Sequence, residues 1–269
     1  MPAPHRPTDL PDAAHAAIAP LTGSPIRKAE ILSAGTDREI AARLHLEDDR
    51  TLFVKGMPSD HPGVKRHRLA AAVAPYTRGL GPALLWHVQR HGWDLLGFED
   101  LDGRPADYRP GSPDVPLVMQ AMQQLSGAAV PPTAGLRSMS SRLRDYAEDK
   151  RYANLFDGEQ LVHTDLNPKN VLIRDGRAHL ANWTRACRGA PWTEPSLWAV
   201  RLIAAGHTAH DAHAWAAGHP AWADAPEDCL IQFARAQHNP WRATTRTGYT
   251  SRWMRTMLTA TAGWSAHLW

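Results

Sequence analysis

Short apolar and polar runs alternate along the first hundred residues of the chain. Three runs rich in aliphatic and β-branched side chains cover residues 26–32, 39–46 and 51–54, and stretches of turn-forming residues separate them. Short runs of this kind, bounded by turn residues, are typical of strands. The pattern therefore predicts an antiparallel meander in this part of the chain.

Two helices and one more strand are expected around the meander. A helix is predicted at 8–19, because Thr8 or Asp9 is suited to cap it. A second helix is predicted at 64–76, and an apolar run predicts a strand at 93–100.

The pattern changes to a helical period after residue 115. Amphipathic stretches predict helices at 115–126 and 135–153, and more helices after Pro195. The block 160–183 differs, because a loop is followed by two short apolar runs around an Asp-Gly turn, which predicts a β-hairpin in a helical region. The stretch 102–114 is rich in Gly, Pro and Asp and is the expected boundary between two lobes.

The composition narrows the class of protein. Of the 269 residues, 43% are hydrophobic and 21% are charged, which is typical of a folded globular chain. The two cysteines form no CxxC pair, and no stretch approaches the roughly 20 apolar residues of a membrane span. We therefore expect a soluble, cytoplasmic protein with no membrane partner. A net charge of +3 is small, and it does not favour a nucleic-acid partner.

One segment has residues that are suited to catalysis. His163, Asp165 and Asn170 follow the spacing H-x-D-x-x-x-x-N between two apolar runs. Phosphoryl transfer needs a carboxylate beside the acceptor hydroxyl and oxygen ligands for a metal ion. Asp165 is suited to the first role and Asn170 to the second, whereas His163 would brace the loop. The alternative is a surface loop in which Asp165 and Asn170 only cap turns.

This segment resembles the catalytic loop of the aminoglycoside phosphotransferase and choline kinase-like family, which often reads H-G-D-x-x-x-x-N. The likeness includes the apolar strand after the loop, the Asp-Gly turn and a second strand that ends at Trp183. It implies an α+β, protein-kinase-like fold with two lobes. The expected parts are a β-rich nucleotide lobe with a leading helix at 1–98, a hinge and linker at 99–114, and a helical lobe with the catalytic loop at 115–269.

The resemblance also implies that the first lobe binds ATP. Lys55 ends the third strand, where the family keeps a lysine that contacts the ATP phosphates. Ser33 and Gly35, in the turn between the first two strands, would cover the nucleotide, although the turn has no G-x-G-x-x-G pattern. Glu99 and Asp100 fall where the hinge would present its backbone to adenine.

Two positions depart from the family pattern. The family's second hairpin strand ends in an Asp that binds Mg²⁺, but here Asn182 takes that place, so Asn170 and Asn182 would hold the metal ion weakly. The family also aligns its lysine with a Glu on the next helix, and no glutamate lies between residues 56 and 98. Asp60 and Asp94 are the remaining acidic candidates for that role.

Two functions are consistent with these features. The first is an ATP- and Mg²⁺-dependent kinase that phosphorylates a hydroxyl of a small molecule, with impaired metal binding, and the retained Asp165 favours it. The second is a pseudokinase that keeps the fold to bind a metabolite, a peptide or a partner enzyme, and Asn182 favours it. Glu194 is a candidate to replace a family Asp that steadies the catalytic loop.

Two weaker patterns have simpler structural explanations. His207, His210 and His213 are spaced three residues apart, but no Cys or Glu completes a metal site. Trp and Arg residues gather within 241–255, a combination also found in nucleic-acid-binding proteins. Core packing of the aromatic rings, with Arg facing water, is the expected explanation, and some of these side chains are candidates to line the acceptor cleft.

Overall fold

The computed structural model describes residues 10–34, 39–128, 130, 135–245 and 251–269. The chain divides into two compact parts, unit 1 (Met1–Asp102) and unit 2 (Gly103–Trp269). The division falls within the predicted linker at 99–114, and the limits of the individual lobes stay predictions. No helix in the described ranges is long and apolar enough to cross a membrane.

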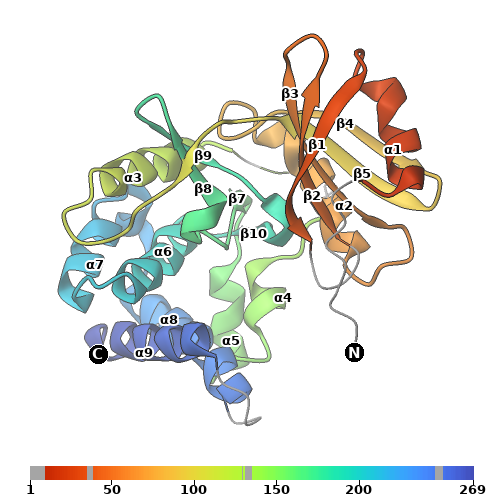
Figure 1. Ribbon diagram of the computed structural model, residues 1–269. Coiled ribbons are helices and arrows are strands. Elements are labelled where there is room, and N and C mark those ends of the chain that lie inside the picture. Colours follow the sequence, from red (N-terminus) through yellow and green to blue (C-terminus); the bar gives the residue numbers. More distant parts are fainter. Residues whose placement is uncertain (1–9, 35–38, 129, 131–134, 246–250) are drawn as a thin grey trace. The chain divides into compact units, whose positions relative to one another are not determined.

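Unit 1 is built on an antiparallel sheet with the strand order β1-β2-β3-β5-β4 (Figure 1). The strands are β1 (Ile26–Ala34), β2 (Ile40–Leu46), β3 (Thr51–Pro58), β4 (Leu84–Arg90) and β5 (Trp93–Glu99). The four predicted runs correspond to β1, β2, β3 and β5. The sequence did not reveal β4, because this edge strand has no fully buried position and includes polar residues such as His87 and Gln89.

The helices of unit 1 cover opposite faces of this sheet. They are α1 (Asp12–Ile18) and α2 (Val64–Val73), followed by the 3-10 turns Ala19–Leu21 and Ala74–Tyr76. Successive residues of a strand point to opposite faces. Leu95 of β5 packs in one core with Ala14 and Ile18 of α1, whereas the preceding Asp94 contacts His67 of α2. The two helices therefore lie on different sides of β5.

The predicted cap of the first helix was wrong. Pro11 takes the N-cap position with φ −55° and makes no side-chain cap, so α1 begins at Asp12. Residues 8 and 9 lie outside the described part of the chain. Proline is well suited to a helix start because its φ is already fixed near the helical value.

A glycine is required at position 97 of β5, where the strand passes under the indole ring of Trp86 on β4. Gly97 lies directly opposite Trp86, and a Cβ atom on Gly97 would come within 2.1 Å of the indole ring. The indole ring therefore occupies the space that a side chain at position 97 would fill. The ring is partly buried and packs against the core that α1 shares with the sheet.

Unit 2 is mainly helical. Its α-helices in the described ranges are α3 (Asp114–Leu125), α4 (Met139–Leu143), α5 (Lys150–Ala153), α6 (Thr193–Ala204), α7 (Ala209–Ala217), α8 (Glu227–Thr245) and α9 (Arg252–His267). The helix predicted at 115–126 corresponds to α3. The single helix predicted at 135–153 was wrong, because the side chains of Ser138 and Asp149 each cap a separate short helix, α4 and α5.

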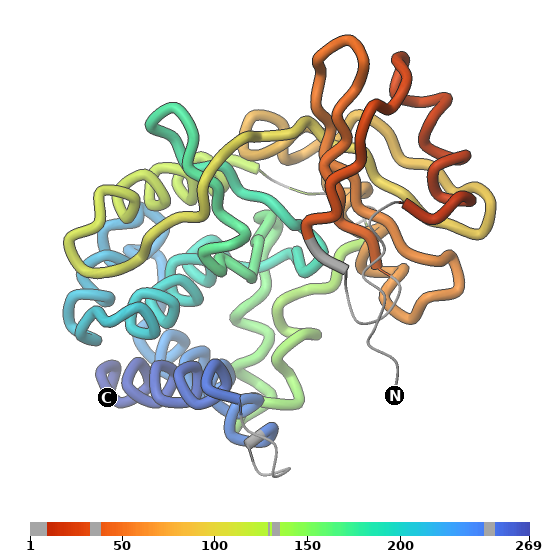
Figure 2. Tube along the Cα trace, viewed as in Figure 1, coloured from red at the N-terminus to blue at the C-terminus, as the bar shows by residue number. Residues whose placement is uncertain are grey.

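Two small antiparallel sheets position the catalytic-loop segment in unit 2. The first pairs β7 (Gln160–Val162) with β10 (Cys187–Gly189), and the second has the order β6 (Arg104–Pro105), β8 (Val171–Arg174), β9 (Arg177–Leu180). Figure 2 shows the yellow segment that leads to α3 passing along this hairpin. Asp175 and Gly176, at the tip of the hairpin, both have positive φ, as a type I′ turn requires.

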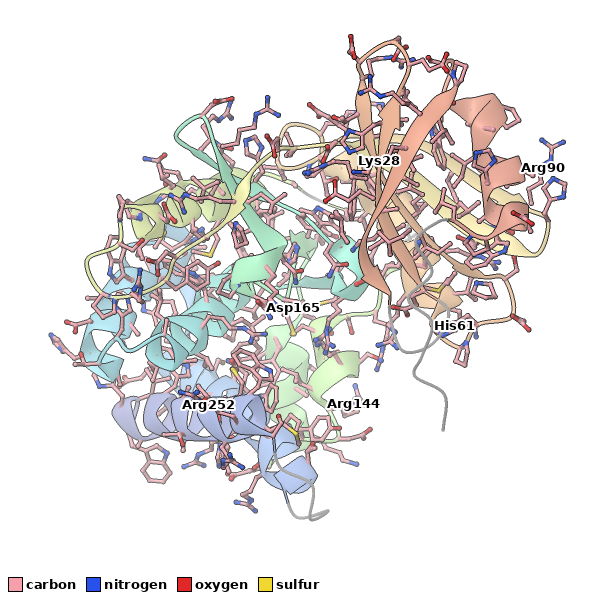
Figure 3. The ribbon with its side chains drawn as sticks, in the orientation of Figure 1. Lys28, His61, Arg90, Arg144, Asp165 and Arg252 are labelled. Carbon is pink, nitrogen blue, oxygen red and sulfur yellow. The ribbon has the colours of Figure 1, made fainter. Side chains whose placement is uncertain are left out.

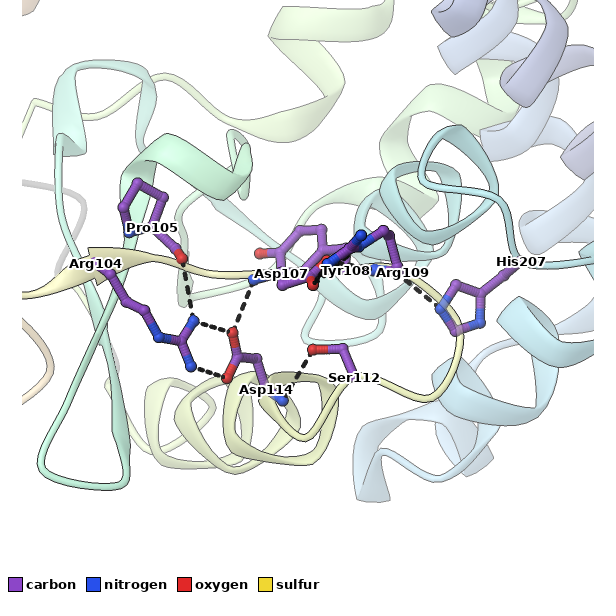
Figure 4. A network of polar contacts seen from close by, with 8 residues as sticks. All are labelled: Arg104, Pro105, Asp107, Tyr108, Arg109, Ser112, Asp114 and His207. Carbon is purple, nitrogen blue, oxygen red and sulfur yellow. Dashed lines mark hydrogen bonds and ion pairs between the residues drawn. The ribbon is translucent and has the colours of Figure 1, made fainter.

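A polar network ties β6 and the segment after it to α3 and to the connection between α6 and α7 (Figure 4). The Arg104 guanidinium donates to both oxygens of the buried Asp114 carboxylate at 2.5 and 2.7 Å, and the N–H of Asp107 donates to the same group at 2.8 Å. The ring of His207 contacts the carbonyl oxygen of Tyr108 at 2.9 Å. These contacts fix the chain that runs between β6 and α3.

Candidate active site

His163 directly follows β7 and is completely buried. Its Nε2 lies 2.8 Å from the carbonyl oxygen of Ala181, and its Nδ1 accepts the N–H of Asp165 at 3.2 Å. The ring also packs against Trp183, with centroids 4.5 Å apart. These contacts hold the ring against the backbone of the loop, and the role of His163 stays a prediction.

Glu194, in the first turn of α6, binds the backbone of the loop. Its carboxylate accepts the N–H groups of His163 and Thr164, the latter at 3.2 Å. Burial raises the pKa of Glu194 to about 7, against the lowering effect of these two hydrogen bonds. The geometry matches the steadying role that the sequence predicted for Glu194.

Thr164 stands where the loop of the related family often has glycine. Its φ is +67°, in the left-handed region that a β-branched residue rarely adopts. The Thr164 hydroxyl donates to the carbonyl oxygen of Arg185 at 2.7 Å. That hydrogen bond and Glu194 together hold the loop in this conformation.

Asp165 forms an ion pair with an arginine that no sequence motif marks. Nη2 of Arg201, on α6, lies 2.8 Å from Oδ1 of Asp165, and the two side chains are only 15% and 20% exposed. The Arg201 guanidinium also lies over the Trp253 ring at 5.2 Å and 3.4 Å from Sδ of Met257, both on α9. The packing of α6 on α9 therefore fixes the arginine beside the carboxylate.

The two predicted metal ligands contact each other. Nδ2 of Asn182 donates to Oδ1 of Asn170 at 3.1 Å, and Nδ2 of Asn170 donates to the carbonyl oxygen of Asp165 at 2.9 Å. The Thr184 hydroxyl donates to Oδ1 of Asn182 at 3.1 Å. Asn182 has φ +66°, which asparagine tolerates better than most residues.

These donors fit a divalent cation poorly. Hard cations prefer several oxygens with negative charge, but Asn170 and Asn182 are neutral, and each amide oxygen already accepts a hydrogen bond. In the described ranges, no group of three or more His, Cys, Asp or Glu side chains could hold a metal ion. His207, His210 and His213, whose spacing was a weak metal pattern in the sequence, form no such group.

Lys55 lies in unit 1, on the face of the sheet that α2 covers. It pairs with Leu96 of β5, which points to the same side as Asp94. Burial lowers the pKa of Lys55 to about 8, and the negative charge of Glu39 opposes this change. The sequence did not indicate Glu39 as an acid that acts on Lys55. Glu39 precedes β2, whereas the family's glutamate follows the lysine in sequence.

Asp94 has basic partners on α2 and β4. It is completely buried, and its carboxylate binds Nδ1 of His67 at 2.8 Å, Nε of Arg68 at 2.6 Å and Nε2 of His87 at 3.0 Å. Burial opposes ionisation, but the hydrogen bonds from Arg68 and the two histidines outweigh it and hold the pKa of Asp94 below its usual value. Helix α2 thus contributes His67 and the cation Arg68 to this sheet face, where the resemblance implied a glutamate.

The other predicted nucleotide residues are only partly described. Gly35 and the side chain of Ser33 lie outside the described residues. The backbone N–H of Glu99 donates to the carbonyl oxygen of Ala83 at 2.9 Å, and the Asp100 carboxylate accepts Nε of Arg43 at 2.6 Å. Their nucleotide roles therefore stay predictions.

Comparisons in sequence find no match, either to a protein-family model or to a curated protein. Solved structures match over nearly the whole chain. An aminoglycoside phosphotransferase from Alicyclobacillus acidocaldarius has 13% identity and a TM-score of 0.65, with 98% of this chain and 97% of that chain covered. A thermostable mutant of the aminoglycoside phosphotransferase APH(4)-Ia, in ternary complex with AMP-PNP and hygromycin B, has 14% identity and a TM-score of 0.60, with 94% and 99% covered.

A third similar structure is the amicoumacin kinase hAmiN in complex with AMP-PNP and Ca²⁺, with 10% identity, a TM-score of 0.55 and coverage of 89% and 88%. At these identities the likeness concerns the fold. The chain therefore has the α+β, protein-kinase-like fold of the aminoglycoside phosphotransferases, as the resemblance of its catalytic-loop segment implied.

Proposed function

We propose that this chain is an ATP-dependent phosphotransferase that acts on a hydroxyl group of a small molecule. The main support is the position of Asp165, which follows a buried, braced histidine on a loop whose backbone is bound by Glu194. A loop held in this way keeps one carboxylate in a defined place, which is what phosphoryl transfer requires of a base.

In the proposed reaction, the acceptor oxygen forms a bond to the γ-phosphorus of ATP. The bond between that phosphorus and the β–γ bridging oxygen breaks, and ADP leaves with the electron pair. The proton of the acceptor hydroxyl passes to a carboxylate oxygen of Asp165. The products are ADP and a phosphate ester.

The nucleotide contacts are proposed from the family resemblance. Lys55 would neutralise charge on the ATP phosphates, and the turn at Ser33 and Gly35 would lie near the nucleotide. The backbone around Glu99 and Asp100 would contact adenine. The lowered pKa of Lys55 supports a binding role, because a partly desolvated ammonium gains more from a phosphate partner than an exposed one does.

We propose that Mg²⁺ binds weakly when it accompanies the nucleotide. Asn170 and Asn182 would hold it, and they would supply amide oxygens without charge. The AMP-PNP and Ca²⁺ complex of the amicoumacin kinase supports the use of a nucleotide and a divalent cation.

The substitution Asp165→Ala tests the proposed base. We expect ADP formation in the presence of a hydroxylated acceptor to fall roughly 100-fold or more, the usual contribution of a general base. Asp145→Ala, at an exposed position of unit 2, is the matched control and should keep full activity. Undiminished turnover by Asp165→Ala would reject the assigned role.

The contact between Asn170 and Asn182 favours a second candidate, a pseudokinase that binds a metabolite, a peptide or a partner enzyme. Asn182→Asp separates the two functions, because it restores the carboxylate of the family. For an enzyme limited by its metal site, we expect about a tenfold gain in Mg²⁺-dependent turnover and tighter ATP binding by calorimetry. A variant that gains neither would favour the binding function.

A further inference from the structure

The surroundings of Asp165 within unit 2 are rich in arginine. Arg201 forms the ion pair with Asp165, and Nη1 of Arg142 donates to the carbonyl oxygen of Arg185 at 3.1 Å. Burial lowers the pKa values of Arg142 and Arg201, the charge of Arg185 lowers them further, and Asp165 opposes the change. Asp165 therefore lies close enough to two guanidinium groups, those of Arg201 and Arg142, to interact with both.

Glu194, which also acts on Arg142 and Asp165, is already engaged with the backbone. Glu194 is buried, and its carboxylate already accepts two backbone N–H groups. Burial also raises its pKa to about 7, so a substantial fraction of Glu194 is neutral at physiological pH. The guanidinium groups of Arg142 and Arg201 thus face one carboxylate that pairs with Arg201 and a second that is bound to the backbone.

A pocket of about 360 Å³ lies between α6 and α9. Its polar wall comes from Arg252, Arg255, Thr256 and Thr259, its other lining residues are apolar, and no carboxylate lines it. The volume is within the range of pockets that bind small molecules. The Thr256 hydroxyl donates to the carbonyl oxygen of Arg252 at 3.1 Å. The two guanidinium groups are the donors in this wall that suit a carboxylate or a phosphate.

Arg201, the ion-pair partner of Asp165, lies close to this pocket without being one of its lining residues. It precedes Ala204, a lining residue of the pocket, by three positions on α6, and residues at this spacing lie on one side of a helix. On α9, its contact Met257 precedes Ala260, another lining residue of the pocket, by three positions. Figure 3 labels Asp165 on its loop and Arg252 at the start of α9.

We propose that the acceptor of this chain is an anionic hydroxylated molecule, whose carboxylate or phosphate group is bound by Arg252 and Arg255 while Arg201 orients its hydroxyl beside Asp165. This inference rests on the proposed function, and it adds the class of substrate. A polycationic acceptor would place like charges beside these arginines, which disfavours binding.

Calorimetry without nucleotide tests the inference with four probes that share one sugar ring: neutral glucose, glucuronate with a carboxylate, glucose 6-phosphate with a phosphate, and cationic glucosamine. We expect at least one anionic probe to bind about tenfold or more tightly than glucose, and glucosamine to bind more weakly than glucose. Comparison of glucuronate with glucose 6-phosphate identifies the preferred anion.

The double variant Arg252→Gln, Arg255→Gln should lose that preference and bring the anionic probe to within about threefold of glucose. Arg144→Gln, which removes an exposed arginine that contacts Asn154, is the matched control and should keep the preference. The inference is wrong if neither anion binds more tightly than glucose, or if the double variant keeps the preference. Because these measurements need no phosphoryl transfer, their failure is distinct from a failure of the Asp165→Ala test.

Discussion

Thr164 illustrates how one residue can depart from a family pattern while the local backbone is kept. The loop needs a left-handed residue between His163 and Asp165, and Thr164 supplies it with φ +67°. A strained backbone of this kind costs on the order of 1–3 kcal/mol and persists when its surroundings hold it. Here Arg185 and Glu194 provide the hydrogen bonds that do so.

Substitutions at Thr164 separate the strain from the hydrogen bond. In Thr164→Gly, relief of strain should offset the lost hydrogen bond, so we expect the free energy of unfolding to stay within about 1 kcal/mol of the parent value. Thr164→Val keeps the β-branch and leaves the Arg185 carbonyl without its donor, so we expect a loss of roughly 2 kcal/mol or more. Urea denaturation measures both values, and equal stability of the two variants would contradict this account.

At the scale of elements, the sequence predicted the parts that depend on local pattern. The hairpin β8–β9 was predicted because an Asp-Gly turn separates two apolar runs. Strands β1, β2, β3 and β5 were predicted because each coincides with a run of apolar residues. Strand β4 was missed because an exposed edge strand has no clear hydrophobic pattern. The division between α4 and α5 was missed because it depends on a side-chain cap, which does not change the hydrophobic pattern.

The partners of Asp94 could not be predicted either. Its carboxylate on β5 binds groups from α2 and β4 that are up to 27 residues away in sequence. Only the pairing of those elements brings the groups together. The sequence therefore named Asp94 as one of two acidic candidates without revealing its partners.

The substitution Asp94→Asn tests how much this buried cluster contributes to the free energy of unfolding. The amide has no charge to balance Arg68 and can accept fewer of the three hydrogen bonds, so we expect a loss of about 3–5 kcal/mol in the free energy of unfolding at pH 7. Asp102→Asn is the control, because the Asp102 side chain is 90% exposed and its contact with Arg43 is 3.6 Å long. A loss below about 1 kcal/mol would show that the cluster does not stabilise unit 1.

For the whole molecule, the candidate site was predictable where its residues are close in sequence. His163, Asp165, Asn170 and Asn182 lie within one short block, so their spacing was sufficient to indicate the fold. Arg201 was not predictable, because its contact with Asp165 depends on how α6 lies against the catalytic-loop segment and on the α9 side chains that hold the arginine. The same limit applies to the α6–α9 pocket.

The stability of the whole chain should depend on pH through Glu194. Its folded pKa of about 7 lies above the usual value for glutamate, so its stabilising contribution is complete below about pH 4 and is lost as the pH rises through 7. Each unit of pKa shift corresponds to about 1.4 kcal/mol, so the loss between pH 5 and 8 should be on the order of 3 kcal/mol.

Unfolding in urea across this pH range measures the effect. Glu194→Gln has no titrating group and should have a flatter dependence of stability on pH than the parent chain. Glu194→Asp keeps a carboxylate on α6 and should retain most of the slope. An unchanged slope in Glu194→Gln would show that another group is responsible.

The hydrogen bond between Asn182 and Asn170 has a further consequence for folding. In Asn182→Asp, a negative oxygen would replace the donor that faces Oδ1 of Asn170, and Asn170 is not free to turn its amide because its Nδ2 donates to the Asp165 carbonyl. Two oxygens would then face each other, and a cation between them would relieve the repulsion. The melting temperature of that variant should therefore rise with added Mg²⁺, so that metal binding would be coupled to thermal stability by the exchange of a single amide for a carboxylate.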